Sequence, residues 1–314
     1  MSGFSPTWLA LRESADHRSR SQSVANTLQT RFLQRETINV IDLGCGTGSN
    51  LRATSSLLPH VQHWTLVDHD PALLAAAKDA LIAWADESLV AADPRAHNLS
   101  SSGSPRGTMP QHDQFFQDQL ELRRGRATIY VRFRQANLVT DLDAVLDLDP
   151  PDLVTASALF DLASPAFIQK FAAAIAKRRA VFYTVLTYNG IQRWIPRTPL
   201  DQSMSGAFSR HQMTDKGFGE ACGPTAPVEL EEQFETHGYT VEEGDSPWRL
   251  GPADHALITE LATGFASAVR ETKSIPNAEI DAWLKRTHTG AEVGHTDTLA
   301  IPGSRSSLTE RDDD

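Results

Sequence analysis

Short apolar runs alternate with segments of helical periodicity along the chain. The apolar runs end in glycine, proline or polar residues, which is typical of buried strands that feed loops. They predict strands near residues 37–43, 63–68, 127–134, 180–187, 239–243 and 291–302. Residues 151–162 are predicted to contain a further strand and the segment that leaves it. Apolar positions at helical spacing and runs rich in alanine and leucine predict helices from about residue 49 and over residues 71–85, 164–178, 228–237, 254–271 and 277–287.

Some segments depart from this simple alternation. Residues 5–35 are mostly polar, with apolar positions at helical spacing toward their end, and predict one or two helices before the first strand. Arg124-Gly125 joins two alternating runs, and Asn189-Gly190 joins two apolar ones, so each predicts a hairpin turn. Residues 196–227 are irregular, with several glycines and prolines.

Strand–helix repeats closed by late strands predict a doubly wound, mostly parallel, seven-stranded α/β sheet with helices on both faces. N-terminal helices precede it, and a cap of helices and loops is inserted before the last strand. The expected division is an N-terminal helical lid at 1–36, a core at 37–195 with a mobile loop at about 91–113, a cap and substrate region at 196–290 with a late core strand near 239–250, the last core strand at 291–302, and a disordered tail at 303–314.

Composition narrows the possible functions. The net charge of −11 disfavours a nucleic-acid partner, because phosphate backbones are repelled. Two cysteines form no disulfide framework and fit a reducing compartment. The first residues lack a signal-peptide pattern, and no apolar run has membrane-spanning length, so we expect a cytoplasmic protein. No histidine–cysteine cluster has zinc-site spacing, and we expect no metal.

The first apolar run ends in a loop with glycine at every second position. Residues 38–50 read Ile-Asn-Val-Ile-Asp-Leu-Gly-Cys-Gly-Thr-Gly-Ser-Asn. Glycine permits positive φ and lets a ligand approach the backbone closely. The segment therefore predicts a strand feeding a ligand-facing loop; a tight strand–helix turn without a ligand is the alternative.

The glycine spacing differs from that of a dinucleotide-binding loop. That fingerprint is G-x-G-x-x-G, with a helix N-terminus aimed at a pyrophosphate. Counted from Gly44 the third glycine is replaced by Ser49, and counted from Gly46 it is replaced by Leu51. The loop G-x-G-x-G therefore favours a ligand without a pyrophosphate.

A carboxylate ends the second predicted strand. Asp68 follows Gly48 by 20 residues, and Asp70-Pro71 behind it suits a helix N-cap and first turn. A carboxylate at this strand end can accept hydrogen bonds from both ribose hydroxyls. A solvated strand-end acid is the alternative for Asp68.

The pattern Asp42-Leu-Gly44-x-Gly46-x-Gly48, joined to Asp68, resembles motif I and the second strand of the class I S-adenosylmethionine (SAM)-dependent methyltransferases, over about residues 37–190. The cap is most similar to uncharacterised bacterial members. The resemblance implies a Rossmann-like fold, SAM as methyl donor and S-adenosylhomocysteine (SAH) as product. It implies a cofactor site of Asp42 at the methionine end, the loop Gly44, Cys45, Gly46 and Gly48, Asp68 and His69 at the ribose, Asn137 and Leu138 at the adenine, and Ser157.

Two residues are candidates for acid–base catalysis. Asp161 lies four residues after Ser157, where the resembling family places acceptor-facing groups, and can orient an amine or act as a base; a helix N-cap or surface acid is the alternative. His211, in the polar segment 210–219, is the neutral-pH base of that segment, or else a surface histidine.

Three residues are candidates for substrate binding. Arg12 shares i, i+4 spacing with Asp16 and Arg20, which indicates either a lid over the cofactor or a salt-bridged helix face. Arg249 can bind a carboxylate or phosphate, or form a structural ion pair. His295 and Asp297 are two residues apart and share one face of the predicted strand. His295 is either a site residue or a structural histidine.

The sequence therefore predicts a SAM-dependent methyltransferase that transfers a methyl group to a small molecule by in-line displacement. The alternatives are an NAD(P)-dependent oxidoreductase and a non-catalytic SAM-binding or interaction protein. The acceptor atom, the need for a base and the oligomeric state are not determined by the sequence.

Overall fold

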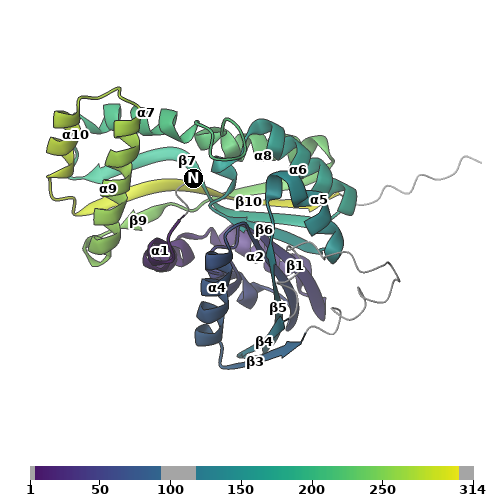
Figure 1. Ribbon diagram of the computed structural model, residues 1–314. Helices are drawn as coiled ribbons and strands as arrows, with labels where there is room; N and C mark the ends of the chain where they lie inside the picture. The colour runs from purple at the N-terminus through teal and green to yellow at the C-terminus, as the bar shows by residue number, and fades with distance from the viewer. Residues whose placement is uncertain (1–3, 93–117, 304–314) are drawn as a thin grey trace, which may run out of the picture.

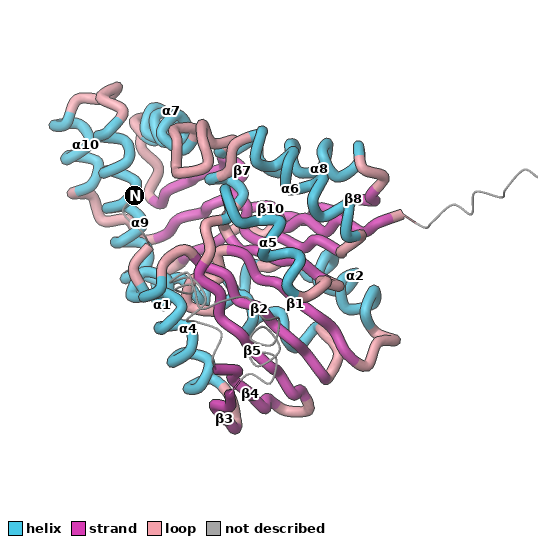
Figure 2. Tube along the Cα trace, turned by 45° about the vertical axis from the view of Figure 1, so that its right-hand side comes forward, coloured by secondary structure: helices cyan, strands magenta, loops and turns pink. Residues whose placement is uncertain are grey.

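The computed structural model describes residues 4–92 and 118–303 and contains a ten-stranded mixed sheet in the order β3-β4-β5-β2-β1-β6-β7-β10-β8, with β9 paired to β10 (Figures 1 and 2). The five central strands β5-β2-β1-β6-β7 are parallel, and β10 is antiparallel to its neighbours. The strands are β1 Thr37–Leu43, β2 Val61–Asp68, β3 Glu87–Ala92, β4 Asp118–Arg124, β5 Ala127–Gln135, β6 Leu153–Ser157, β7 Val181–Ile195, β8 Tyr239–Asp245, β9 Trp248–Leu250 and β10 Gly290–Pro302. The predicted doubly wound α/β class is confirmed, but the predicted number of seven strands is wrong: the short or peripheral strands β3, β4 and β9 bring the described sheet to ten.

Two hydrophobic cores lie on the two faces of the sheet. Neighbouring residues of β1 alternate between them: Val40 belongs to one core and Ile41 to the other. The helices are α1 Pro6–Ser19, α2 Gln22–Phe32, α3 Ser49–Thr54, α4 Pro71–Trp84, α5 Leu138–Leu148, α6 Pro165–Arg178, α7 Asp201–Gln212, α8 Ala226–Thr236, α9 His255–Glu271 and α10 Asn277–Leu284. Helices α5, α6 and α8 cover one face (Figure 1).

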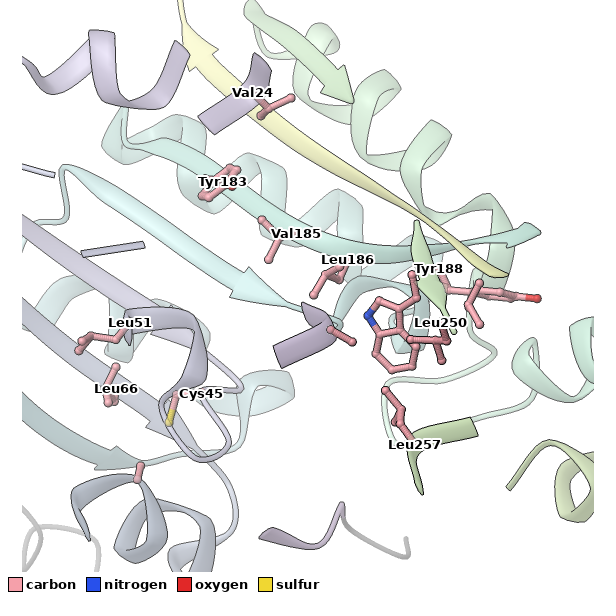
Figure 3. Close-up of a cluster of buried hydrophobic side chains, with 14 of the residues drawn as sticks. Val24, Cys45, Leu51, Leu66, Tyr183, Val185, Leu186, Tyr188, Leu250 and Leu257 are labelled. Carbon is pink, nitrogen blue, oxygen red and sulfur yellow. The ribbon is translucent and has the colours of Figure 1, made fainter. Parts of the chain in front are cut away.

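The other core is larger and joins distant parts of the chain. Helices α1 to α4 cover the sheet there, while α7, α9 and α10 surround the far ends of β7 and β10. Figure 3 shows Val24 of α2 beside Tyr183 of β7, and Cys45 of the glycine loop near Leu51 and Leu66. The glycine loop is thus anchored in the core that also holds the N-terminal helices. No helix within the described ranges has the length and apolar character needed to cross a membrane.

The hairpin prediction at Asn189-Gly190 is wrong, because β7 continues through it as one 15-residue strand. Val293 of β10 pairs with Gln192, and His295, two residues on, pairs with Tyr188. The extra residues of β7 bulge out of the ladder, and Gly190 takes a φ of 89° there. Asn-Gly marks a bulge because β10, rather than a returning arm of β7, supplies the pairing partner.

Other differences lie at the edges. The hairpin at Arg124-Gly125 is present, but β4 also pairs with the unpredicted edge strand β3. Of the predicted loop at 91–113, residues 91 and 92 belong to β3, and the rest lies outside the described residues. The irregular segment 196–227 contains the unpredicted helix α7. Of the predicted tail, residues 304–314 also lie outside the described residues.

Candidate functional site

A pocket of about 430 Å³ opens at the carboxyl ends of β1, β2, β5 and β6. Ligands of doubly wound sheets bind at this edge, where loops leave the strands. Helix α1 forms one wall through Leu9, Arg12 and Asp16, and Phe4, just before the helix, also lines the pocket. Residues 215–218 and the turn that leaves β6 form a further part of the lining. The glycine loop and Asp68 belong to the same lining.

The glycine loop takes the conformation that its spacing predicts. Gly44, Gly46 and Gly48 have φ values of 63°, 53° and 74°, in the left-handed region that favours glycine. At Gly46 the space is also limited, because a Cβ atom there would lie 3.0 Å from Leu9 Cδ1 of α1. Gly44 and Gly46 line the pocket, whereas Gly48 packs behind it against α4 as the N-cap of α3.

Asp68 is fixed by backbone amides at the floor of the pocket. Its Oδ2 accepts a hydrogen bond of 2.9 Å from Gly46 N–H, and Oδ1 accepts one of 3.0 Å from Asp70 N–H. His69, which also lines the pocket, lies with Nδ1 3.3 Å from Oδ1. Each carboxylate oxygen can accept a second bond, so the group can still bind hydroxyls of a ligand. Asp70 caps α4 by accepting from Ala72 N–H, as predicted.

Asp42 lies beneath the loop, fully buried and outside the pocket lining. Burial raises the pKa of its carboxyl to about 7, against the opposing effects of a hydrogen bond from Asn50 and the charge of Arg20. Asn50 Nδ2 donates to Asp42 Oδ1 at 2.7 Å and to Thr155 Oγ1 at 3.0 Å. Within the described residues, Asp42 Oδ2 has no hydrogen-bond partner. Asn50 itself reaches the pocket, so it connects the buried carboxylate to the ligand space.

The ends of the next strands supply three more predicted residues. Asn137, Leu138 and Ser157 all line the pocket. The side-chain oxygen of Asn137 accepts a 3.0 Å hydrogen bond from Val139 N–H and thereby caps α5. Its side-chain amide N–H groups are therefore the more available atoms for a ligand. Cys45 also lines the pocket, and burial raises the pKa of its thiol, which keeps it protonated.

Helix α1 is held over the glycine loop by polar contacts. Arg52 of α3 donates two hydrogen bonds, of 2.8 and 2.6 Å, to the Glu13 carboxylate. His17 Nε2 lies 2.9 Å from Ser49 Oγ. The Arg20 guanidinium donates to Asn50 Oδ1 at 2.9 Å and to Thr54. The first helix is thus bound to the short helix that follows the loop.

The Arg12–Asp16 pair joins α1 to the late strands. Arg12 Nε donates to both Asp16 oxygens, at 2.9 and 3.2 Å, and the guanidinium lies 4.9 Å from the centre of the Trp248 ring. Trp248 Nε1 donates to Asp16 Oδ1 at 3.0 Å. Both Arg12 and Asp16 line the pocket. The i, i+4 pair therefore forms a salt bridge and at the same time faces the ligand space.

Two predicted site residues lie behind the pocket wall. Asp161 is buried, and burial raises the pKa of its carboxyl to about 6, opposed by the backbone N–H groups of Asp161 and Tyr188. His295 is buried against Trp248, and burial, followed by the charge of Arg12, lowers its pKa to about 3. Neither belongs to the pocket lining. His295 is therefore a neutral histidine at physiological pH.

The remaining two predicted residues lie elsewhere. Arg249 is exposed and lines a separate surface depression with Arg18 and Asp245. His211 is at the end of α7, where its Nε2 lies 3.0 Å from Glu271 Oε2. The polar segment that contains His211 nevertheless reaches the pocket, through residues 215–218.

Several lining residues had no sequence signal of function. They are mostly apolar: Phe4, Leu9, Leu73, Val139, Leu159, Leu162 and Phe218, joined by Thr47, Ser49 and Lys216. Leu9 has the helical spacing of any core residue, and only its contact with Gly46 places it at the site. The Asp-Lys-Gly-Phe stretch at 215–218 belongs to the polar segment 210–219, in which the sequence indicated His211 as the candidate residue.

No protein-family model matches the chain, and no curated protein matches it. Among solved structures, it is similar to the YcgJ protein of Bacillus subtilis, with 11% identity and a TM-score of 0.48 over 90% of this chain and 100% of that one. It is similar to the cyclopropane synthase MmaA2 of Mycobacterium tuberculosis, with 13% identity and a TM-score of 0.45 over 95% and 94%. A SAM-dependent methyltransferase of Thiobacillus denitrificans, in complex with SAH, is similar with 13% identity and a TM-score of 0.40 over 95% and 99%. These values describe distant likenesses of shape.

Proposed function

We propose that the protein is a SAM-dependent methyltransferase that acts on a small molecule. One observation carries the proposal: Gly46 N–H, in the G-x-G-x-G loop, binds the Asp68 carboxylate at the floor of a pocket at the strand ends. The loop and the carboxylate come from two different strands, and the fold holds them in contact. A merely structural turn would not need to direct a carboxylate into a ligand-sized pocket.

The pocket residues fit the parts of SAM. Asp68 has free acceptor capacity for the ribose hydroxyls, and the amide N–H groups of Asn137 beside Leu138 suit the adenine edge. The unpartnered Asp42 oxygen, with Asn50 above it, suits the amine of the methionine end through an intervening water. A pyrophosphate fits less well, because α3 has only six residues and Ser49 at its first turn is in contact with His17.

SAM supplies a methyl group that is already electrophilic, so the protein has to align the acceptor and exclude water. Leu159, Leu162 and Phe218 give the pocket an apolar wall, which serves both purposes. A base is needed only for an acceptor that must lose a proton. Asp161, directly behind this wall with a pKa of about 6, is the candidate base, ionised at neutral pH. Arg12 is the candidate acceptor contact on α1.

Calorimetric titration with SAH tests the proposal. Wild-type protein should bind SAH, and Asp68→Asn should weaken binding about tenfold or more, because it removes a charge-assisted hydrogen bond. Asp79→Asn, an exposed carboxylate on α4, is the charge-matched control and should bind as wild type. Unchanged affinity in Asp68→Asn would remove the ribose assignment.

Two alternatives are separated by further titrations. An NAD(P)-dependent oxidoreductase should quench or shift NADH fluorescence on binding, and wild-type protein that binds NADH but not SAH would establish that class. A non-catalytic SAM-binding protein should bind SAH yet transfer no label from methyl-labelled SAM to an extract of the native cell.

A further inference from the structure

Three residues from α7, the following loop and α9 form a hydrogen-bonded chain that ends at the pocket. Glu271 Oε2 lies 3.0 Å from His211 Nε2, and His211 Nδ1 lies 3.4 Å from Lys216 Nζ. Lys216 lines the pocket, whereas His211 does not. The histidine of this segment therefore stands behind a lysine that faces the ligand space.

The partners fix the direction of each hydrogen bond. A glutamate carboxylate only accepts, so His211 Nε2 carries the proton and donates to Glu271. His211 Nδ1 is then a lone pair that accepts from the Lys216 ammonium. Thr214 Oγ1 donates to the carbonyl oxygen of His211 and accepts from Lys216 at 2.9 Å. Two of the three ammonium hydrogens are thus used, and the third is left for the pocket.

The loop that carries Lys216 has a defined shape. Asp215 Oδ1 accepts from Gly217 N–H at 2.6 Å and from Gly219 N–H at 3.1 Å, which closes a turn around the lysine. Phe218, the next side chain along, packs edge-on against Phe167 of α6 with ring centres 4.8 Å apart. In residues 4–92 and 118–303, no carboxylate lies within ion-pair distance of Lys216. Among the described residues, the direct hydrogen-bond acceptors of the ammonium are the neutral atoms His211 Nδ1 and Thr214 Oγ1.

The surroundings of Lys216 combine a positive charge with apolar surface. The pocket that Lys216 lines is also lined by Phe4, Leu159, Leu162 and Phe218. The other pocket cation, Arg12, is already paired with Asp16. Partial burial lowers the pKa of Lys216, opposed by the charge of Glu271.

We propose that Lys216, positioned by His211 and Glu271, binds the carboxylate of the methyl acceptor, and that the acceptor is a small carboxylic acid with an apolar body. This inference rests on the proposed methyltransferase function, because it takes the strand-end half of the pocket as the site of the methyl donor. It gives His211 a positioning role in place of that of a base.

Benzoate and benzamide are matched probes, because they have the same size and ring and differ in charge. Each is titrated calorimetrically into protein saturated with SAH. Wild-type protein should bind benzoate at least tenfold more tightly than benzamide, the effect of one charge-assisted hydrogen bond. Lys216→Met should lose that preference, and Lys216→Arg should keep it. Lys177→Met, which removes an exposed charge on α6, should behave as wild type.

The positioning residues should act on the same preference more weakly. His211→Phe and Glu271→Gln should reduce benzoate binding by roughly threefold and leave benzamide binding unchanged, since Lys216 keeps its charge but loses its orientation. A general loss of structure would instead reduce binding of benzoate, benzamide and SAH together. Both variants should therefore retain wild-type affinity for SAH.

Three results would overturn the inference: equal binding of the two probes by wild-type protein, binding of neither, or an unchanged preference in Lys216→Met. A tenfold loss of SAH affinity in Lys216→Met would also overturn it, because the lysine would then hold the methionine carboxylate of the donor. If wild-type protein binds no SAH, the proposed function fails. The same probe comparison without SAH then still decides whether Lys216 selects a carboxylate.

Discussion

The two sides of the pocket are built in different ways. The strand-end side, with the glycine loop and Asp68, is fixed by backbone conformation and by hydrogen bonds between residues about 20 positions apart. The covering side, with α1 and residues 215–218, is fixed by side-chain contacts, among them that of Asp16 with Trp248 far along the chain. The first side depends on backbone conformation and on one carboxylate, whereas the second is made of side chains that can vary residue by residue. A methyl donor common to many enzymes and an acceptor particular to one would need this division.

The largest expected effect concerns the buried carboxylate of the strand-end side. With a folded-state pKa of about 7, Asp42 keeps its proton in the folded protein, while the unfolded chain loses it near pH 4. The stability it contributes is complete below pH 4 and is lost as the pH rises to about 7. Asp42→Asn should therefore gain about 3 kcal/mol relative to wild type between pH 5 and pH 8. Denaturant unfolding of both proteins across this pH range measures the difference in their unfolding free energies. A difference that does not change with pH would contradict the assignment of Asp42 as a buried carboxyl with a raised pKa.

The next effect tests the backbone of the same side. Gly46→Ala places a side chain at a φ of 53° and against Leu9, which should cost about 1–3 kcal/mol and reduce SAH affinity about tenfold. Gly125→Ala is the matched control: its φ is 56°, but nothing lies within 4 Å of the added atom. It should lose similar stability and bind SAH normally. Equal SAH affinity in both variants would show that α1 moves away without consequence.

The late strand β10, behind the pocket wall, has a pH dependence of opposite sign. His295 is neutral when folded, with a pKa of about 3, and the unfolded chain gains a proton below about pH 6.5. Its contribution to stability is therefore complete above pH 6.5 and is lost as the pH falls toward 3. Wild-type protein should lose about 2 kcal/mol relative to His295→Gln between pH 6.5 and pH 5. A difference in unfolding free energy between wild type and His295→Gln that stays constant on acidification would indicate that His295 is solvated in the folded protein.

The smallest effect distinguishes buried from exposed contacts of α1. Arg18 pairs with Asp254 at 2.6 Å, but 41% of its side chain is exposed, so Arg18→Ala should cost less than about 1 kcal/mol. Chemical denaturation provides the measurement. A loss above about 2 kcal/mol would mean that surface pairs, rather than Asp16 and Trp248, hold the helix in place.

The strand-end side was predictable because its determinants are local. Glycine at alternate positions and an aspartate at the next strand end require neither a partner sequence nor a long-range contact to be recognised. The alternation of apolar runs and helices likewise indicated the doubly wound class, but not the order of the strands in the sheet. The Asn189-Gly190 hairpin was wrong because the dipeptide describes a local bend and does not specify which strand pairs beyond it.

The covering side of the pocket and some peripheral elements could not be predicted, for a physical reason. Helix α7 buries only Met204 and Ala207, so its periodicity was too weak to detect. The edge strand β3 exposes Leu89 and Val90, and so lacks the burial pattern of a core strand. Lys216 gains significance only from its contact with His211 and from the pocket in front of it. Arg12 and Asp16 were recognisable as a pair, but Trp248 was not recognisable as their partner.

The contacts of α1 also bear on synthesis. The first helix leaves the ribosome at the outset. Asp16, however, contacts Trp248, which is made 232 residues later, and the N–H of Ser21, just after the helix, donates to the Asp297 carboxylate, which is made 276 residues later. Contacts of such long range form late, because loop closure must precede them. The glycine loop and Asp68 can meet as soon as β2 has paired with β1. The contacts of α1 with α3 likewise need no residue beyond Thr54, so the contacts that join the N-terminal helices to β9 and β10 are the last for which all residues become available during translation.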